Sequence, residues 1–243
     1  MNLRKRGGAR DVRDALRTFA DPERARNSAW FFKTGRGQYG EGDRFRGIRV
    51  PAQRKIARQF RDLPLNEIAL LLASVYHEDR FTALAILVAQ YEAGDAAARE
   101  RIFRFYLAHT RCINNWDLVD CSARYIVGAH LQRRPRWRLY RLARSKSLWE
   151  RRIAMVATHA WIAAGDTADA YAIAELLLDD EHDLMHKAVG WSLRQCGDFS
   201  RAELLRFLER HYARVPRTAL RYAIEHLPQV ERTAVLSGNF RAQ

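Results

Sequence analysis

The chain has 243 residues, 48% of them hydrophobic, and carries a formal net charge of +14. This length and composition exclude a string of small modules, and three cysteines without a C-x-x-C spacing favour buried thiols in a reducing cytosol over a disulfide framework or a cysteine zinc site. The N-terminal run Met1-Asn2-Leu3-Arg4-Lys5-Arg6 has no apolar stretch behind it, and no later apolar run is long enough to cross a bilayer, so we expect neither a signal peptide nor a membrane protein.

The basic excess indicates the class of partner. There are 42 Lys and Arg against 28 Asp and Glu, and only five of the basic residues are lysines. The planar guanidinium of arginine suits phosphate oxygens, so the charge predicts a polyanionic partner. The alternative is that an Arg-rich and Ala-rich composition reflects the base composition of a genome and forms a solvated face.

Apolar residues recur at three- and four-residue spacing almost everywhere after residue 10, and no stretch alternates as a strand would. The fold class predicted is therefore all-α. Prolines mark the expected helix starts, where the missing N–H costs little. These are Pro22, Pro51, Pro64, Pro135 and Pro216.

The segment 34–49 interrupts the helical pattern with five glycines and is predicted to be an ordered or mobile loop. Its Gly35, Gly37 and Gly40 match the letters of a dinucleotide fingerprint. No strand precedes them and no βαβ unit surrounds them, so that interpretation is rejected.

A weak repeat follows the loop. Helices aligned on Ala83, Ala154, Ala188 and Ala219 give intervals of 71, 34 and 31 residues, and a further copy is expected near residue 118. The repeating unit is two helices long, and such pairs stack into a curved solenoid with a concave surface. We therefore predict one domain over residues 1–243 that contains the Gly-rich loop, with a basic concave face.

Positions two before and two after each repeat centre lie four residues apart and share one helix face. With their neighbours they combine aromatic, basic and acidic side chains, which is typical of a binding surface and not of a packed core. The members are Phe81, Ala85, Trp116, Asp120, Arg152, Val156, His186, Lys187, Gly190, Trp191, Arg217, Thr218, Arg221 and Tyr222.

Trp116 and Asp120 are the strongest candidates for chemistry. They lie one turn apart on a helix that Asn114 or Asn115 would cap, so an indole face and a carboxylate can both stabilise a cation. The alternative places Trp116 in the core and Asp120 in a surface salt bridge. Asp117 is a competing carboxylate, better suited to offset the dipole of the first turn.

Other chemistry is weakly indicated. His182 and His186 have the spacing of metal ligands but no third ligand follows, and no serine or cysteine has a base partner by spacing. We therefore predict no metal and no cofactor.

Six specific segments are spread over most of the chain. They are WFFKTGRGQYGEGDRF at 30–45, GIRVP at 47–51, INNWDLVD at 113–120, LWERRIA at 148–154, HDLMHKAVGW at 182–191 and PRTALRYAIE at 216–225. Through these segments the chain resembles the AlkD-like DNA alkylation repair glycosylases, a family of HEAT-like repeat proteins. The resemblance implies an α-solenoid of HEAT-like repeats that clasps duplex DNA. It also implies a metal-free monofunctional glycosylase that releases N3- and N7-alkylated purines, such as 3-methyladenine and 7-methylguanine, and that need not flip the base.

By the same resemblance, the family's catalytic carboxylate falls on Asp120, its lesion-facing tryptophans on Trp116 and Trp191, and its site arginine on Arg152. One departure is Arg36, where family members often carry proline in the Gly-rich loop. From the helix-face pattern, we assign DNA contacts to a second set of side chains. They are His186, Lys187, Arg217, Thr218 and Arg221.

The leading hypothesis is thus a monomeric DNA glycosylase of the bacterial cytosol and nucleoid that acts on alkylated bases in double-stranded DNA. The alternative is a non-catalytic HEAT-repeat protein that binds damaged or branched DNA. A third hypothesis is a protein-binding scaffold.

Overall fold

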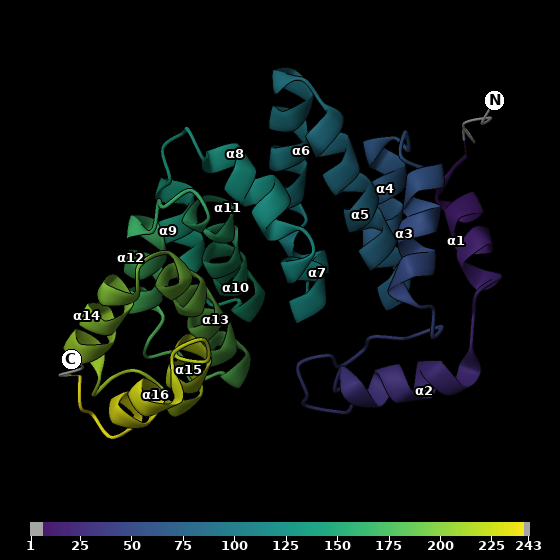
Figure 1. Cartoon of the computed structure of the whole chain (residues 1–243). Helices are drawn as coiled ribbons and strands as arrows, with labels where there is room; N and C mark the ends of the chain where they lie inside the picture. Colours follow the sequence, from purple (N-terminus) through teal and green to yellow (C-terminus); the bar gives the residue numbers. More distant parts are fainter. Residues whose placement is uncertain (1–6, 241–243) are drawn as a thin grey trace. The chain divides into compact units, whose positions relative to one another are not determined.

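The computed structural model describes residues 7–240, and over these residues the chain is all-α, as predicted (Figure 1). The β structure of this range is limited to an isolated parallel bridge between Arg44 and Tyr76. The chain divides into two compact units, one up to Ile126 and one from Val127. The single domain over 1–243 stays a prediction.

The first unit holds six longer helices and several short ones. They are α1 (Ala9–Arg17), α2 (Pro22–Phe31), α3 (Val50–Gln59), α4 (Leu65–Leu72), α5 (His77–Ala93), α6 (Ala96–Ala108), the 3₁₀ turn η1 (Thr110–Cys112) and α7 (Trp116–Asp120). A π-helical turn, η2 (Arg124–Gly128), contains the boundary between the units.

The second unit consists of helical pairs. Its helices are α8 (Ala129–Leu131), α9 (Trp137–Ala143), α10 (Leu148–Ala157), α11 (His159–Ile162), α12 (Ala168–Leu176), α13 (Asp183–Phe199), α14 (Arg201–His211), α15 (Arg217–Ala223) and α16 (Gln229–Leu236). None of the helices between residues 7 and 240 combines the length and apolar character that a membrane crossing requires.

Prolines and short polar side chains start these helices, as the sequence predicted. Pro22 follows the N-cap Asp21, whose carboxylate accepts a hydrogen bond from Arg24 N at 2.9 Å. Pro64 and Pro216 are themselves the N-cap residues of α4 and α15. The first N–H groups of a helix have no partner inside it. The Asp21 carboxylate accepts a hydrogen bond from one of them, and a proline at the helix start has no N–H that would need a partner.

Helix α5 is the centre of the first unit and packs against α3, α4, α6 and α7. Most of its apolar residues are buried, and so are the four polar and charged residues of its first turn, His77, Glu78, Asp79 and Arg80. A buried charge is costly unless it is paired and hydrogen-bonded. The partners of this turn come chiefly from the Gly-rich loop.

The Gly-rich loop is ordered by those partners. One Glu78 oxygen accepts hydrogen bonds from the amides of Arg46 and Gly47 at 2.9 and 2.8 Å, and Asp79 forms an ion pair with Arg46 at 2.5 Å. Gly47 has a φ of 75°, and a Cβ there would lie 2.2 Å from the carbonyl oxygen of Asp21. Only glycine fits this combination of conformation and close approach.

The second unit repeats a packed pair of helices. Helix α9 packs on α10, α12 on α13 and α14 on α13, while α10, α13 and α15 pack side by side. All five repeat centres predicted from the sequence are buried. They are Ala83 on α5, Leu118 on α7, Ala154 on α10, Ala188 on α13 and Ala219 on α15. The repeat frame therefore marks equivalent core positions of successive second helices.

Candidate functional site

Helix α7 carries both leading candidates, Trp116 as its first residue and Asp120 as its last. Asn115 is the N-cap, as predicted, with extended backbone and a side-chain oxygen that accepts from Trp116 N at 2.8 Å. Both candidate side chains are partly exposed. A helix of five residues is not stable alone, so their placement depends on the contacts that hold α7.

Aromatic rings support Trp116 from the side of α2 and the loop. Its ring stacks on Phe32 at a centroid distance of 5.3 Å, and Phe31 meets its edge at 6.0 Å. Phe32 also stacks on Phe45 at 5.0 Å. Phe31 is more than half exposed, so the supported indole lies beside an accessible aromatic surface.

A buried charge cluster lies beneath these rings. The imidazole of His77 has Asp43 Oδ2 at 3.1 Å from Nδ1 and Asp117 Oδ2 at 2.8 Å from Nε2. Asp43 also pairs with Arg80 at 2.5 Å and accepts from the Asn115 amide at 3.3 Å. Two carboxylates are thereby matched by two cations, which is the condition for burying such charges.

This environment favours the charged forms of His77 and Asp43. Burial by itself lowers the pKa of His77, but the charge and hydrogen bond of Asp117, with the hydrogen bond to Asp43, outweigh it and raise the pKa to about 9. Burial raises the pKa of Asp43, yet His77 and Arg80 bring it below its usual value. His77 is therefore an imidazolium at neutral pH and donates from both ring nitrogens.

A groove of about 290 Å³ lies in the same unit, between α3, α5 and the residues after α7. Arg54 and Arg58, one turn apart on α3, line one side, and Tyr125 lines another. Phe81 and Ala85, two members of the predicted helix face, also line it. The face predicted from the repeat thus borders a real groove in this unit.

In the second unit, Arg152 and Trp191 lie on α10 and α13, which pack together. Arg152 is buried, with 5% of its surface exposed, and donates to the carbonyl of Leu184 at 2.6 Å. Trp191 is partly exposed and its ring meets the edge of His159 at 4.3 Å. Arg152 therefore also has a packing role, joining α10 to the first turn of α13.

The predicted DNA-contact residues lie on α13 and α15, which pack closely. Lys187 pairs with Asp183 at 2.7 Å, and Asp183 is also hydrogen-bonded to Thr218. Arg217 is exposed and donates to the carbonyl of Leu236 at 2.8 Å.

His186 donates from Nε2 to the carbonyl of Asp180, and His182 caps α13 by accepting from Leu184 N at 3.1 Å. Arg221 is exposed on α15. Both histidines thus have helix-terminal roles, and no group of three or more candidate metal ligands occurs within residues 7–240.

Four members of the predicted helix face are buried: Phe81 and Arg152, each 5% exposed, together with Val156 and Gly190. Val156 is fully buried and belongs to the core, and Gly190 is buried where α13 meets α15. A Cβ on Gly190 would lie 2.5 Å from both the carbonyl oxygen of Ala219 and Cβ of Tyr222. Position in the repeat does not distinguish a surface residue from one that a neighbouring helix covers.

The sequence did not indicate roles for Asp43, His77 or the supporting rings of Phe31, Phe32 and Phe45. Asp117 was predicted as a competing carboxylate better suited to the first turn, and the structure adds its contact with His77. Residues 43, 77 and 117 are far apart along the chain and follow no common spacing. A usable signal is the run His77-Glu78-Asp79-Arg80 at the start of a largely apolar helix, because charges there need buried partners.

Comparison with known proteins gives a consistent result. The family model described as "DNA alkylation repair enzyme" matches residues 12–227. Among solved structures, the chain is similar to a predicted DNA alkylation repair enzyme from Enterococcus faecalis, with 17% identity and a TM-score of 0.68 over 86% of this chain and 97% of that chain. At this identity the structural likeness concerns the fold alone. No curated protein matches the chain.

The family model extends over both compact units, from α1 to the segment after α15, and includes α7 with Trp116 and Asp120. The chain therefore belongs to the DNA alkylation repair enzyme family and has a role in DNA repair.

Proposed function

We propose that the protein is a monofunctional DNA glycosylase that hydrolyses the N-glycosidic bond of N3- and N7-alkylated purines in duplex DNA, without metal or cofactor. The observation that carries the proposal is α7, which presents a supported indole and a carboxylate one turn apart on a partly exposed surface. Family membership supports a repair enzyme acting on DNA.

In this proposal Asp120 stabilises the positive charge that develops on the deoxyribose as the bond to the base breaks, or positions the attacking water. A fixed carboxylate favours a cation that exists only in the transition state, so it accelerates the reaction and does not merely bind substrate. Trp116 faces the sugar and adds the attraction of its ring for a cation.

The preference for alkylated purines follows from the chemistry of the leaving base. A purine alkylated at N3 or N7 is already cationic and departs neutral, so it needs no general acid, whose help is typically worth about 10²–10⁴-fold. A single carboxylate beside an aromatic ring then suffices. Uracil and 8-oxoguanine lack this lability and are expected to stay in the duplex.

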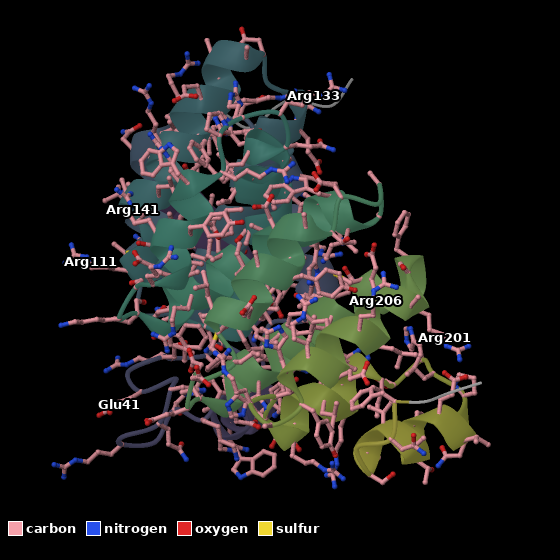
Figure 2. The ribbon with its side chains drawn as sticks, turned by 90° about the vertical axis from the view of Figure 1, so that its left-hand side faces the viewer. Glu41, Arg111, Arg133, Arg141, Arg201 and Arg206 are labelled. Atoms are coloured by element: carbon pink, nitrogen blue, oxygen red, sulfur yellow. The ribbon has the colours of Figure 1, made fainter. Side chains whose placement is uncertain are left out.

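The second unit contributes DNA contacts in this proposal. Trp191 and Arg152 are assigned to the lesion nucleotide from the family resemblance, and His186, Lys187, Arg217, Thr218 and Arg221 to the DNA backbone. Arginines reach away from the ribbon elsewhere too, as Arg111 and Arg141 do in Figure 2. Such charges support salt-sensitive, sequence-independent binding. We further propose that the protein acts as a monomer in the bacterial cytosol.

The test is single-turnover base release from four duplexes that differ only at one lesion: 3-methyladenine, 7-methylguanine, uracil and 8-oxoguanine. The wild type is compared with Asp120→Asn, and Asp198→Asn serves as a matched control on the exposed end of α13. We expect release of the two methylated bases only, with a loss of about 10²–10³-fold in Asp120→Asn at unchanged duplex affinity.

Comparable wild-type rates on uracil and 7-methylguanine would refute the argument from the cationic base. Near wild-type release by Asp120→Asn would remove the assigned role of that carboxylate. Duplex binding without release from any substrate would favour the non-catalytic DNA-binding alternative.

A further inference from the structure

The buried cluster around His77 is not needed for the charge chemistry of Asp120, and its position suggests a second role. His77 is 3% exposed and lies on α5, Asp43 is in the Gly-rich loop, and Asp117 is on α7 between the two candidate catalytic residues. One side chain thus joins three segments that are far apart in the sequence. We propose that the imidazolium of His77 is a positioning residue that bridges Asp43 to Asp117 and thereby fixes Trp116 and Asp120 for base release. This inference rests on the proposed function of α7.

Helix α7 is too short to be stable as an isolated helix. It spans five residues, and the backbone bonds at its ends run from Val119 N to Asn115 O at 3.2 Å and from Cys121 N to Asp117 O at 3.0 Å. So short a helix loses more chain entropy than its hydrogen bonds recover. Side-chain contacts with the rest of the unit must therefore hold it.

The cluster supplies such contacts at both residues that flank Trp116. Asp43 accepts from the N-cap Asn115, which is completely buried, and His77 donates to Asp117. Beyond the other end of α7, the hydroxyls of Tyr106 and Ser122 are 2.9 Å apart. Trp116 and Asp120 lie between these attachments.

The aromatic rings connect the same cluster to Trp116. The His77 ring lies 4.9 Å from Phe32 and 4.8 Å from Phe45, and Phe32 stacks on Trp116. A displacement of His77 would therefore also shift the indole of Trp116 through Phe32, in addition to its effect through Asp117. The charged groups that face His77 are Asp43 from the loop, Arg80 from its own helix and Asp117 from α7.

The charge state gives the proposal a measurable consequence. With His77 protonated, two carboxylates face two cations, whereas loss of the proton leaves the buried Asp43 and the partly buried Asp117 with Arg80 alone. Burial lowers the pKa of His77, but the charge of Asp117 and the hydrogen bonds to Asp117 and Asp43 raise it to about 9. The bridge from Asp43 through His77 to Asp117 therefore persists at neutral pH and is lost above about pH 9.

The experiment measures single-turnover release of 7-methylguanine by the full-length protein from pH 6 to 10, after subtraction of the spontaneous rate. His77→Gln is compared with His226→Gln, a control that removes an exposed histidine 2.7 Å from Asp198. We expect a loss of about 10- to 100-fold in His77→Gln at unchanged duplex affinity, and a wild-type rate in His226→Gln.

The pH profile separates positioning by charge from a general packing role. Wild-type release should fall above about pH 9, and Asp117→Asn should move this decline to lower pH because it removes the main charge that holds the proton on His77. Full activity of His77→Gln, or a decline at the same pH in Asp117→Asn, would overturn the inference.

Hydrogen exchange keeps the inference testable if the wild type releases no base, an outcome that counts against the proposed function alone. At pH 7, the amides of Val119 and Cys121 should exchange at least about tenfold faster in His77→Gln, while those in the middle of α5 keep wild-type protection. Unchanged exchange in α7 would overturn the inference whatever the protein's activity.

Discussion

In the unit up to Ile126, a short helix that carries candidate catalytic groups is held by buried charges, whereas in the unit from Val127 the helices that carry candidate DNA contacts are held by close backbone packing. Helix α7 depends on Asp43, His77 and Asp117. Helices α13 and α15 approach each other at Gly190, which has no side chain of its own and lies against Ala219 and Tyr222.

The two arrangements respond to different perturbations. An ion-pair network depends on protonation, and a single missing member leaves its partners buried without compensation. Close helix packing does not depend on pH but tolerates no added volume at the contact. Changes in pH should therefore act on the support of α7, and an added side chain should act on the contact between α13 and α15.

The largest expected effect is the pH dependence of stability in the first unit. The pKa of His77 is raised from 6.5 to about 9, so its stabilising contribution is complete below about pH 6.5 and is lost as the pH rises to about 9. At 1.36 kcal/mol per pH unit this amounts to about 3 kcal/mol. Urea unfolding at several pH values measures it.

His77→Gln should flatten this dependence, and His226→Gln should leave it as in the wild type. An equal slope in the wild type and His77→Gln would show that other groups govern stability over this pH range.

The second-largest expected effect is a loss of stability in Gly190→Ala, in the second unit. Alanine favours a helix by about 1 kcal/mol over glycine, but its Cβ would meet the backbone of α15, and such overpacking costs about 1–3 kcal/mol. We expect a net destabilisation of up to about 2 kcal/mol that does not change with pH.

Gly197→Ala on the same helix is the matched control. Its Cβ would meet the end of the Leu204 side chain, which can rotate, so the loss should be smaller. Equal free energies of unfolding for the two variants would contradict the role given to backbone approach at Gly190.

The smallest effect concerns DNA affinity. Arg221 is exposed, and no ion pair joins it to another residue of the described range, so Arg221→Ala should weaken duplex binding and reduce the slope of log affinity against log salt by about 1. Arg201→Ala is the control, because Arg201 is already paired with Glu231 at 2.7 Å. A fluorescence anisotropy titration in increasing salt compares them. Equal slopes would remove Arg221 from the DNA contacts.

Much of the architecture could be predicted from the sequence. Helical periodicity determines which residues of a helix share a face, so the all-α class and the buried repeat centres, such as Ala154 and Ala188, followed from spacing alone. Proline and asparagine act on the backbone next to them, so the starts of α2 and α7 were also predictable.

Only the tertiary structure determined which contacts hold α7, and which residues of the predicted helix face are covered by a neighbouring helix. The cluster joins Asp43, His77 and Asp117, and successive members are about 30–40 residues apart in the sequence. Local spacing carries no information about contacts at that separation. Gly190 and Val156 matched the predicted face in register but are buried, because exposure depends on the packing of a neighbouring helix and not on the helix's own period. Short-range backbone preferences act within one turn and can be read along the chain, whereas the pairing of buried charges requires the folded neighbours that keep water out.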